Sequence, residues 1–281
     1  MKKRAERFKL YEYGIFAAVT AVTVIVCVCL GSVSVPVSET ISAIAGAVKG
    51  LFTGVAPPET TNASVIVAVR LPRVLAVALT GASLSLCGAA VQGLLRNPLA
   101  DASNLGVSSG AAVGAVLSIA FGFSIPGLFQ AGTMMSAMVF AFLSLVLILG
   151  LSYRLDYSLS TNTIILIGLI YTMFASSVTS LVVTFAGSKV QSIVFWMMGS
   201  LSGAKYRDVV VLAVSLAVFG AVIFRYAREL NAFAIGEDNA RNVGVNVERV
   251  KYAVLIAVSA LVGVCVSIGG SIGFVGLVMP H

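Results

Sequence analysis

The stretch Arg70-Leu-Pro-Arg73 is followed by an apolar run and then by Gly93-Leu-Leu-Arg96-Asn97-Pro98-Leu99-Ala100-Asp101. The two polar boundaries are separated by about 20 residues, the length that an α-helix needs to cross roughly 30 Å of hydrocarbon. Pro98 cannot continue a helical hydrogen-bond ladder, so the helix must end near Arg96. The stretch therefore predicts a membrane-spanning helix over 74–95.

The rest of the chain repeats this pattern. Hydrophobic residues make up 59% of it, charged residues only 10%, and the mean hydropathy is +1.04. The apolar runs are continuous, whereas a membrane β-barrel would need alternation, so helices must satisfy the backbone in lipid. We expect an all-α polytopic membrane protein that forms one transmembrane domain over 1–281. About seven complete spans are predicted at 14–35, 74–95, 105–122, 132–151, 161–185, 208–226 and 251–269, and an eighth begins near Ser271.

The distribution of lysine and arginine predicts a cytoplasmic N-terminus. With residues 1–13 inside, twelve of the 18 basic residues are cytoplasmic, which agrees with the positive-inside rule. The net charge of +7 then reflects anchoring to anionic lipid, and no nucleic-acid partner is needed to explain it. The other six are Lys49, Arg70, Arg73, Lys189, Lys205 and Arg207.

The sequence contains no pattern for catalysis or metal binding. Its four cysteines lie inside predicted spans without CxxC spacing, and its one histidine, His281, is the last residue. No His/Glu cluster, Ser-His pair or Asp dyad lies at membrane depth, so we expect no catalytic residue, no metal site and no cofactor on this chain. The middle of every complete span also lacks Asp, Glu, Lys and Arg. Ion-coupled carriers keep such residues there, so the energy for transport must come from elsewhere or transport is passive.

The longest polar segment, 225–250, is predicted to be a cytoplasmic loop. Within it, Glu237 to Asn246 is typical of a short helix with acids in its first turn and a glycine terminator at Gly244. Such a helix can seat in a groove of a soluble partner, or it can be a solvated connector. Composition alone favours the connector.

Arg70 and Arg73 lie on the predicted outer face, against the charge rule. Their guanidinium groups can bind carboxylates of a docking protein or phosphates of the lipid. The residues by themselves do not favour the docking protein over the lipid as the partner.

Glycine and other small residues are dense in the spans and predict close helix packing. Gly110 and Gly114 form a small-xxx-small pair. Packing alone is the simpler reading for each of them, and a gate near the glycine-rich end of the chain is the more ambitious one. The candidates for packing or gating are Gly88, Gly93, Asn97, Pro98, Gly106, Gly110, Gly114, Gly273, Gly276 and Pro280.

Two shorter helices are expected outside the spans. Residues 41–49 have the apolar spacing of a surface helix that ends before Pro57-Pro58. Residues 191–199 are apolar but too few to cross the membrane, so they predict an outer-face or re-entrant helix with Trp196 at the interface.

In six stretches the chain resembles the FecCD permeases, which belong to ABC importers for iron-siderophore, haem and cobalamin. The resemblance runs from about Val65 to His281. The matching stretches are Arg70–Arg73, Gln92–Asp101, Leu105–Ala111, Phe195–Gly203, Gly236–Gly244 with Arg249, and Ile272–His281.

The resemblance implies a ten-helix permease fold in the cell membrane and a set of partners. These are a second permease copy or a homologous permease, two ATPase subunits that bind ATP and Mg, and an extracellular or periplasmic solute-binding protein. It implies that Arg70 and Arg73 engage acidic residues of the binding protein. It also implies that a coupling helix docks on the ATPase, with Ala240 and Gly244 at close-approach positions; its residues are Glu237, Asp238, Ala240, Arg241, Gly244 and Asn246.

Family members continue beyond Pro280-His281, so we expect this chain to lack the last helices and to assemble poorly alone. The function implied is import of an iron-siderophore complex, with haem or cobalamin as further substrates. A secondary transporter or channel without an ATPase is the alternative.

Overall fold

The computed structural model describes residues 10–31, 35–53, 61–101, 105–123, 131–157 and 160–281. Every regular element in these ranges is a helix. In chain order they are α1 (Leu10–Cys29), α2 (Val37–Thr53), α3 (Thr61–Val65), the π-helical turn η1 (Ile66–Arg70), α4 (Leu71–Leu95), α5 (Val107–Phe121), α6 (Ala131–Leu155), α7 (Thr161–Phe185), the 3-10 turn η3 (Gly187–Lys189), α8 (Val190–Met197), α9 (Tyr206–Arg225), α10 (Ala227–Phe233), α11 (Glu237–Asn242), α12 (Val247–Gly269) and α13 (Val275–Val278).

Six helices in the described part of the chain are long and apolar enough to cross a membrane. They are Tyr11–Cys29, Ala63–Leu95, Gly132–Leu155, Thr161–Phe185, Tyr206–Arg225 and Val247–Gly269. The all-α membrane fold is thus confirmed. The third predicted span, 105–122, is a helix of 15 residues, α5, which reaches only about 22 Å. Gly106 and Gly122 end it on both sides because each has a positive φ, 83° and 70°, at which a helix cannot continue.

The described chain packs as two compact units. The smaller unit contains residues up to Val77 together with Gly203–Tyr206, and the larger contains Ala78–Ser202 and Arg207–His281. The basic residues before α1 and the predicted break at Pro57-Pro58 lie outside the described residues.

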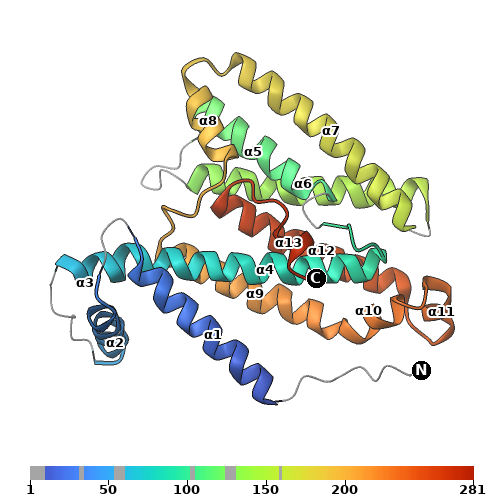
Figure 1. Ribbon diagram of the computed structural model, residues 1–281. Helices are drawn as coiled ribbons and strands as arrows, with labels where there is room; N and C mark the ends of the chain where they lie inside the picture. The colour runs from blue at the N-terminus through green and yellow to red at the C-terminus, as the bar shows by residue number, and fades with distance from the viewer. Residues whose placement is uncertain (1–9, 32–34, 54–60, 102–104, 124–130, 158–159) are drawn as a thin grey trace. The chain divides into compact units, whose positions relative to one another are not determined.

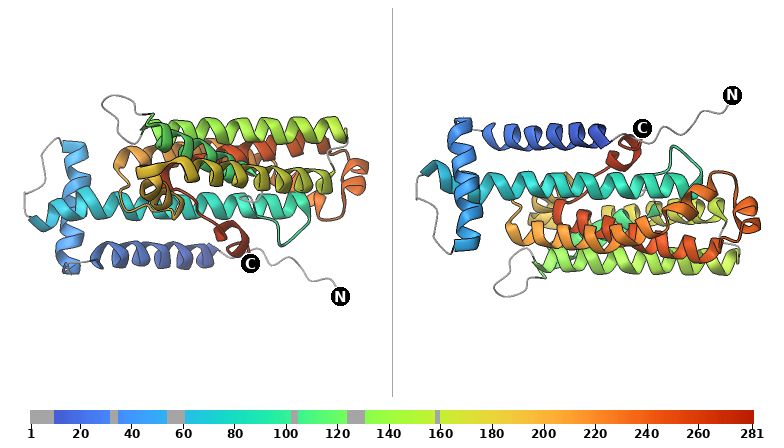
Figure 2. Two further views of the ribbon diagram at one scale, coloured as in Figure 1. Left: turned by 90° about the horizontal axis from the view of Figure 1, so that it is seen from above. Right: turned by 90° about the horizontal axis from the view of Figure 1, so that it is seen from below.

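The smaller unit is built on α1, α2, α3 and η1. Helix α2 lies across the end of α1 (Figure 2) and confirms the predicted surface helix, although it is longer than residues 41–49. A small apolar core joins these elements. Its buried members are Val28, Val35, Ala43 and Ile66.

The boundary Arg70–Arg73 does not precede the second span but lies inside it. The helix runs from Ala63 to Leu95, 33 residues or about 50 Å, and therefore extends beyond the hydrocarbon. Pro72 has no N–H to give to the carbonyl four residues back, so the regular i→i−4 ladder is interrupted there. Just before it, Leu71 donates to Ile66 one residue further back than in an α-helix, which forms the π turn η1. The extra residue rotates Arg70 relative to the rest of the helix.

In the larger unit, α5 lies at the centre and packs against α6, α7 and α12. The long helices α6, α7, α9 and α12 run through this unit, and the short helices α10 and α11 gather at one end of it (Figure 1). Helix α12 is the most buried of the six spans, because 72% of its most apolar 18-residue stretch is buried within the protein. We call the end with α10 and α11 the inner end, because it holds the polar segment predicted to be cytoplasmic.

The glycines of α5 explain how closely it approaches α6. A Cβ atom on Gly110 would lie 2.5 Å from Ser144 Oγ, and one on Gly114 would overlap the carbonyl oxygen of Ser136 and lie 2.7 Å from Phe140 Cβ. In lipid, helices gain little from hydrophobic burial, so such close approach supplies much of the association energy.

We expect Gly114→Ala to lower the free energy of unfolding by about 1–3 kcal/mol, because its methyl group would press on the backbone of α6. Gly150→Ala on α6 is the matched control. Nothing lies within 4 Å of the position of its Cβ, so we expect it to be neutral or to stabilise by up to about 1 kcal/mol through helix propensity. Thermal unfolding in detergent measures both, and equal losses in the two variants would contradict this packing role.

Candidate functional site

The candidate site is the short helix α11 at the inner end of the larger unit. It begins at Glu237, as the sequence predicted, and ends at Asn242. The N–H of Val245 donates to Ala240 and the N–H of Gly244 donates to Arg241, the two bonds of a Schellman motif. The motif needs a left-handed residue, and Gly244 supplies it with a φ of 89°. The chain is thereby turned directly into α12.

Asn246 has a structural task at this turn. Its side-chain oxygen accepts a hydrogen bond of 3.0 Å from the backbone N–H of Arg249 and so caps α12. Asn246 is also exposed, and the contact with the ATPase that the resemblance implies for it stays a prediction.

Ala240 does not lie on an outward face. It is fully buried within the chain itself, so it cannot be the close-approach position for a partner that the resemblance implies. Glu237 and Ala240 face the bundle of this chain, whereas Gly244 is exposed and ends the helix.

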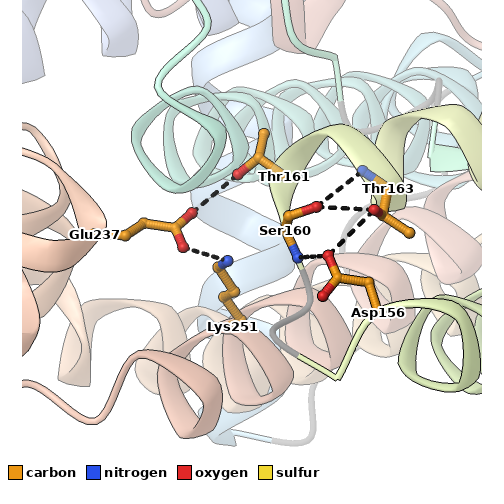
Figure 3. Close-up of polar contacts among 6 residues, drawn as sticks. All are labelled: Asp156, Ser160, Thr161, Thr163, Glu237 and Lys251. Carbon is orange, nitrogen blue, oxygen red and sulfur yellow. Dashed lines mark hydrogen bonds and ion pairs between the residues drawn. The ribbon is translucent and has the colours of Figure 1, made fainter.

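Glu237 also turns inward. Its Oε2 accepts from Lys251 Nζ at 2.7 Å, and its Oε1 accepts from Thr161 Oγ1 at 3.1 Å (Figure 3). The Lys251 side chain is 0% exposed, although we had counted it among the cytoplasmic charges that lie near lipid. A buried ammonium needs an anion, because water no longer stabilises it.

The outward face of α11 is formed by other residues. Asp238, Arg241 and Gly244 are exposed. The large apolar side chains that flank the helix, Ile235 and Val243, are 60% and 66% exposed. Two exposed aliphatic side chains beside a charged helix make a small mixed surface at the inner end.

The N-terminus of α7 lies next to Glu237. Ser160 caps this helix by accepting from the N–H of Thr163. Asp156, just after α6, accepts from the backbone N–H of Ser160 at 3.1 Å and from Thr163 Oγ1 at 3.3 Å (Figure 3). Asp156 therefore connects the end of α6 to the first turn of α7.

Sequence reasoning missed Lys251, Thr161 and Asp156. One signal was present for Lys251. It follows Val247 by four residues and precedes Val254 by three, so it continues the apolar stripe of α12. A lysine in a stripe that faces the core predicts a buried charge and a partner carboxylate.

In the smaller unit, Arg70 is buried and Arg73 is exposed. Arg70 Nη1 donates to the carbonyl oxygens of Val28 and Cys29 at 3.0 and 3.1 Å. These are among the last carbonyls of α1, which have no donor within their own helix. The cation also compensates the negative end of the helix dipole.

This geometry changes what can be expected of the two arginines. We expected both guanidinium groups to be available to a partner, but that of Arg70 binds the end of α1. Docking to a binding protein remains a prediction, and of the two it suits Arg73 better.

The last residues of the chain run along α4. A Cβ atom on Gly88 would overlap the carbonyl oxygen of Gly276, and Gln92 Nε2 donates to the carbonyl of Leu277 at 3.2 Å. At the end of α4, the Oδ1 atom of Asn97 accepts from the N–H of Leu99 at 2.9 Å. The carbonyl oxygen of Pro98 lies 3.1 Å from His281 Nε2.

The remaining glycines predicted to pack or gate divide into two groups. A Cβ on Gly106 would lie 2.6 Å from Ile148 Cδ1, so this glycine does permit a close contact. Nothing lies within 4 Å of a Cβ on Gly93 or Gly273, so for these two the structure gives no packing reason. A gating role for any of them, and for Pro280, stays a prediction.

Residues 199–200, which follow α8, contact residues 269–270 at the end of α12. We call this contact the outer junction. Helix α8 confirms the short apolar helix predicted at 191–199. The N–H of Ser200 donates to the carbonyl of Gly269 at 2.7 Å, and a Cβ atom on Gly270 would lie 2.8 Å from the Cα of Gly199. After this junction comes the four-residue helix α13, Val275–Val278, whereas the sequence predicted that an eighth span begins near Ser271.

In the described residues, no group of three or more His, Cys, Asp or Glu side chains is placed to hold a metal ion.

Comparison with known proteins gives one consistent picture. The model of the FecCD transport family matches residues 19–281. An uncharacterized ABC transporter permease, YvrB of Bacillus subtilis, is 36% identical over 281 residues, which cover all of this chain and 78% of that protein. The cobalamin import permease BtuC of Halobacterium salinarum is 37% identical over 224 residues, 80% of this chain and 59% of that protein.

A solved structure is similar as well. It is described as a metal-chelate type ABC transporter in an inward-facing conformation. It has a TM-score of 0.80 and 30% identity, and the match covers 96% of this chain and 79% of that one. For several of the curated relatives, including BtuC, the matched region is less than two thirds of their length.

We expect Arg70→Met to lower the free energy of unfolding by about 2 kcal/mol, because the carbonyls of Val28 and Cys29 lose a charged donor. Arg73→Met, an exposed position three residues away, is expected to change it by about 0.5 kcal/mol or less. Thermal unfolding of the two variants in detergent, side by side, decides the point. The assignment fails if both melt at the same temperature as the parent.

Proposed function

Because this chain belongs to the FecCD transport family, we propose that it is the membrane-spanning permease of an ATP-driven importer. Permease subunits perform no bond chemistry of their own. ATP and Mg are held by partner ATPase subunits, and closure of those subunits drives the membrane helices between outward- and inward-open states. In this proposal the N-terminus is cytoplasmic, and two permeases, identical or homologous, form the path.

The observation that carries the proposal is the build of α11. A helix of six residues is too short to be stable alone. Yet α11 is held by a buried ion pair at one end and by a Schellman turn at the other. Exposed aliphatic residues flank it where no lipid is expected to cover them. This is the surface that we propose seats on the ATPase.

The substrate we propose is a metal chelate, with an iron-siderophore complex first. The relatives include permeases named for iron(3+)-hydroxamate import in Bacillus subtilis and for Fe(3+) dicitrate transport in Escherichia coli. Cobalamin is the second candidate because a cobalamin permease is among the relatives with high identity. Haem remains a third. A molybdate permease from Haemophilus influenzae also appears among the relatives, so smaller oxyanions belong in the same test.

We expect Val243→Asp to abolish co-purification of the ATPase subunits, because a carboxylate would be buried at the proposed interface without a partner. Phe185→Glu is the control. It places a carboxylate at another highly exposed apolar position, at the far end of α7, and assembly should be retained. Affinity purification of the complete transporter from its host measures assembly, and co-purification of the ATPase at the parent level with Val243→Asp would refute this docking surface.

We expect uptake into proteoliposomes that contain the complete transporter to require ATP, Mg and a substrate-loaded binding protein. Radiolabelled ferric siderophore, cobalamin, haem and molybdate, each offered with its receptor, should give one saturable signal. Uptake that persists without nucleotide would support the alternative, a secondary transporter or channel. A signal for cobalamin alone would replace the siderophore by the second candidate.

A further inference from the structure

The two oxygens of Glu237 connect α11 to two different helices. One oxygen is bound by Lys251, in the second turn of α12, and the other by Thr161, the first residue of α7 (Figure 3). These three residues lie far apart in the sequence. Their meeting is therefore a product of the fold, and the Glu237 carboxylate adds to the turn at Gly244 a side-chain connection from α11 to both α7 and α12.

The joint extends to a fourth helix. Thr161 is adjacent to Ser160, the cap of α7, and Ser160 and Thr163 are both bound by Asp156 at the end of α6. A displacement of α11 thus acts on the first turn of α7 through Thr161 and on α12 through Lys251. Because Asp156 already accepts from the backbone N–H of Ser160 and from Thr163 Oγ1, a displacement of the first turn of α7 also acts on the end of α6.

Stability alone does not explain this arrangement. Replacing a buried ion pair with apolar residues of similar size is often neutral or stabilising, so such pairs are weak contributors to the free energy of folding. What an ion pair does supply is geometry. Lys251 is fully buried, its ammonium lies 2.7 Å from a carboxylate that is only 24% exposed, and moving the two apart would separate a buried cation from its anion.

We infer that Glu237 is the joint that makes α11 move as one body with the inner ends of α7 and α12. It is a positioning residue, and it acts by transmitting displacement between helices rather than by touching substrate or nucleotide. The inference rests on the proposed function only for the source of the displacement. The joint itself is a property of this chain.

Hydrogen exchange of the purified chain tests the joint without any partner. Three variants loosen it in different ways. Thr161→Val removes one bond at nearly constant volume, Glu237→Gln removes the charge, and the double variant Glu237→Gln, Lys251→Met removes the stranded ammonium as well. The controls are Thr184→Val, whose hydroxyl donates to the carbonyl of Ser180 within α7, and Glu248→Gln, an exposed carboxylate on α12.

We expect the amides of Arg241 to Val245 to exchange about tenfold faster in the three variants and at the parent rate in the controls, since exchange reports local opening. Exchange in the three variants at the parent rate overturns the joint. So does equal acceleration in the controls, which would show that any change at this end loosens α11.

The complete transporter tests transmission. We expect Thr161→Val and the double variant to keep their ATPase subunits but to hydrolyse about fivefold more ATP per substrate imported, the lower range of typical coupling between sites. The inference is overturned if the ratio of ATP hydrolysed to substrate imported stays within twofold of the parent. It is also overturned if the variants lose assembly together with ATP hydrolysis and import, because the contact would then have only a structural role. If the unaltered protein binds no ATPase, the proposed function fails, while the exchange measurement still decides the joint.

Discussion

A peptide group without a hydrogen-bond partner costs several kcal/mol in hydrocarbon, and this constraint determines most of the structure. Within each helix the groups satisfy one another, so the difficulty lies at the ends. The chain solves it differently at each end. Arg70 reaches across to the last carbonyls of α1, and Gly244 closes α11 with a Schellman turn. At the outer junction, Ser200 donates to the carbonyl of Gly269. The residues that end helices therefore also connect one helix to another.

Buried charge follows from the same constraint. Arg70 and Lys251 are buried cations. Each binds oxygen atoms that belong to another helix. Arg70 fastens α1 in the smaller unit. Lys251 fastens α11 in the larger one, where a rigid attachment has a functional meaning if α11 is the element that receives force. In the proposed function, this attachment lets the membrane spans respond to the ATPase, although the sequence has no charged residue in the middle of any complete span.

Close packing completes the arrangement, and here particular glycines matter while others do not. Gly110 and Gly114 let α5 approach α6, and Gly88 lets the end of the chain lie on α4. Gly93 and Gly273, which look equivalent in the sequence, have open space around them. A count of small residues therefore predicts that helices pack tightly, but it does not show where. The contact depends on which face of each helix meets its neighbour.

The sequence by itself determined the helical membrane fold, the family, the position of most spans and the short helix that Gly244 ends, because these follow from apolar run length and from local turn chemistry. It did not determine that Arg70 and Ala240 face inward, that Arg70–Arg73 lies within a helix, or that Lys251 is buried with Glu237. Those features depend on the rotation of each helix about its axis. That rotation is set by contacts between residues far apart in the chain, and a π turn of one extra residue at η1 is enough to change it.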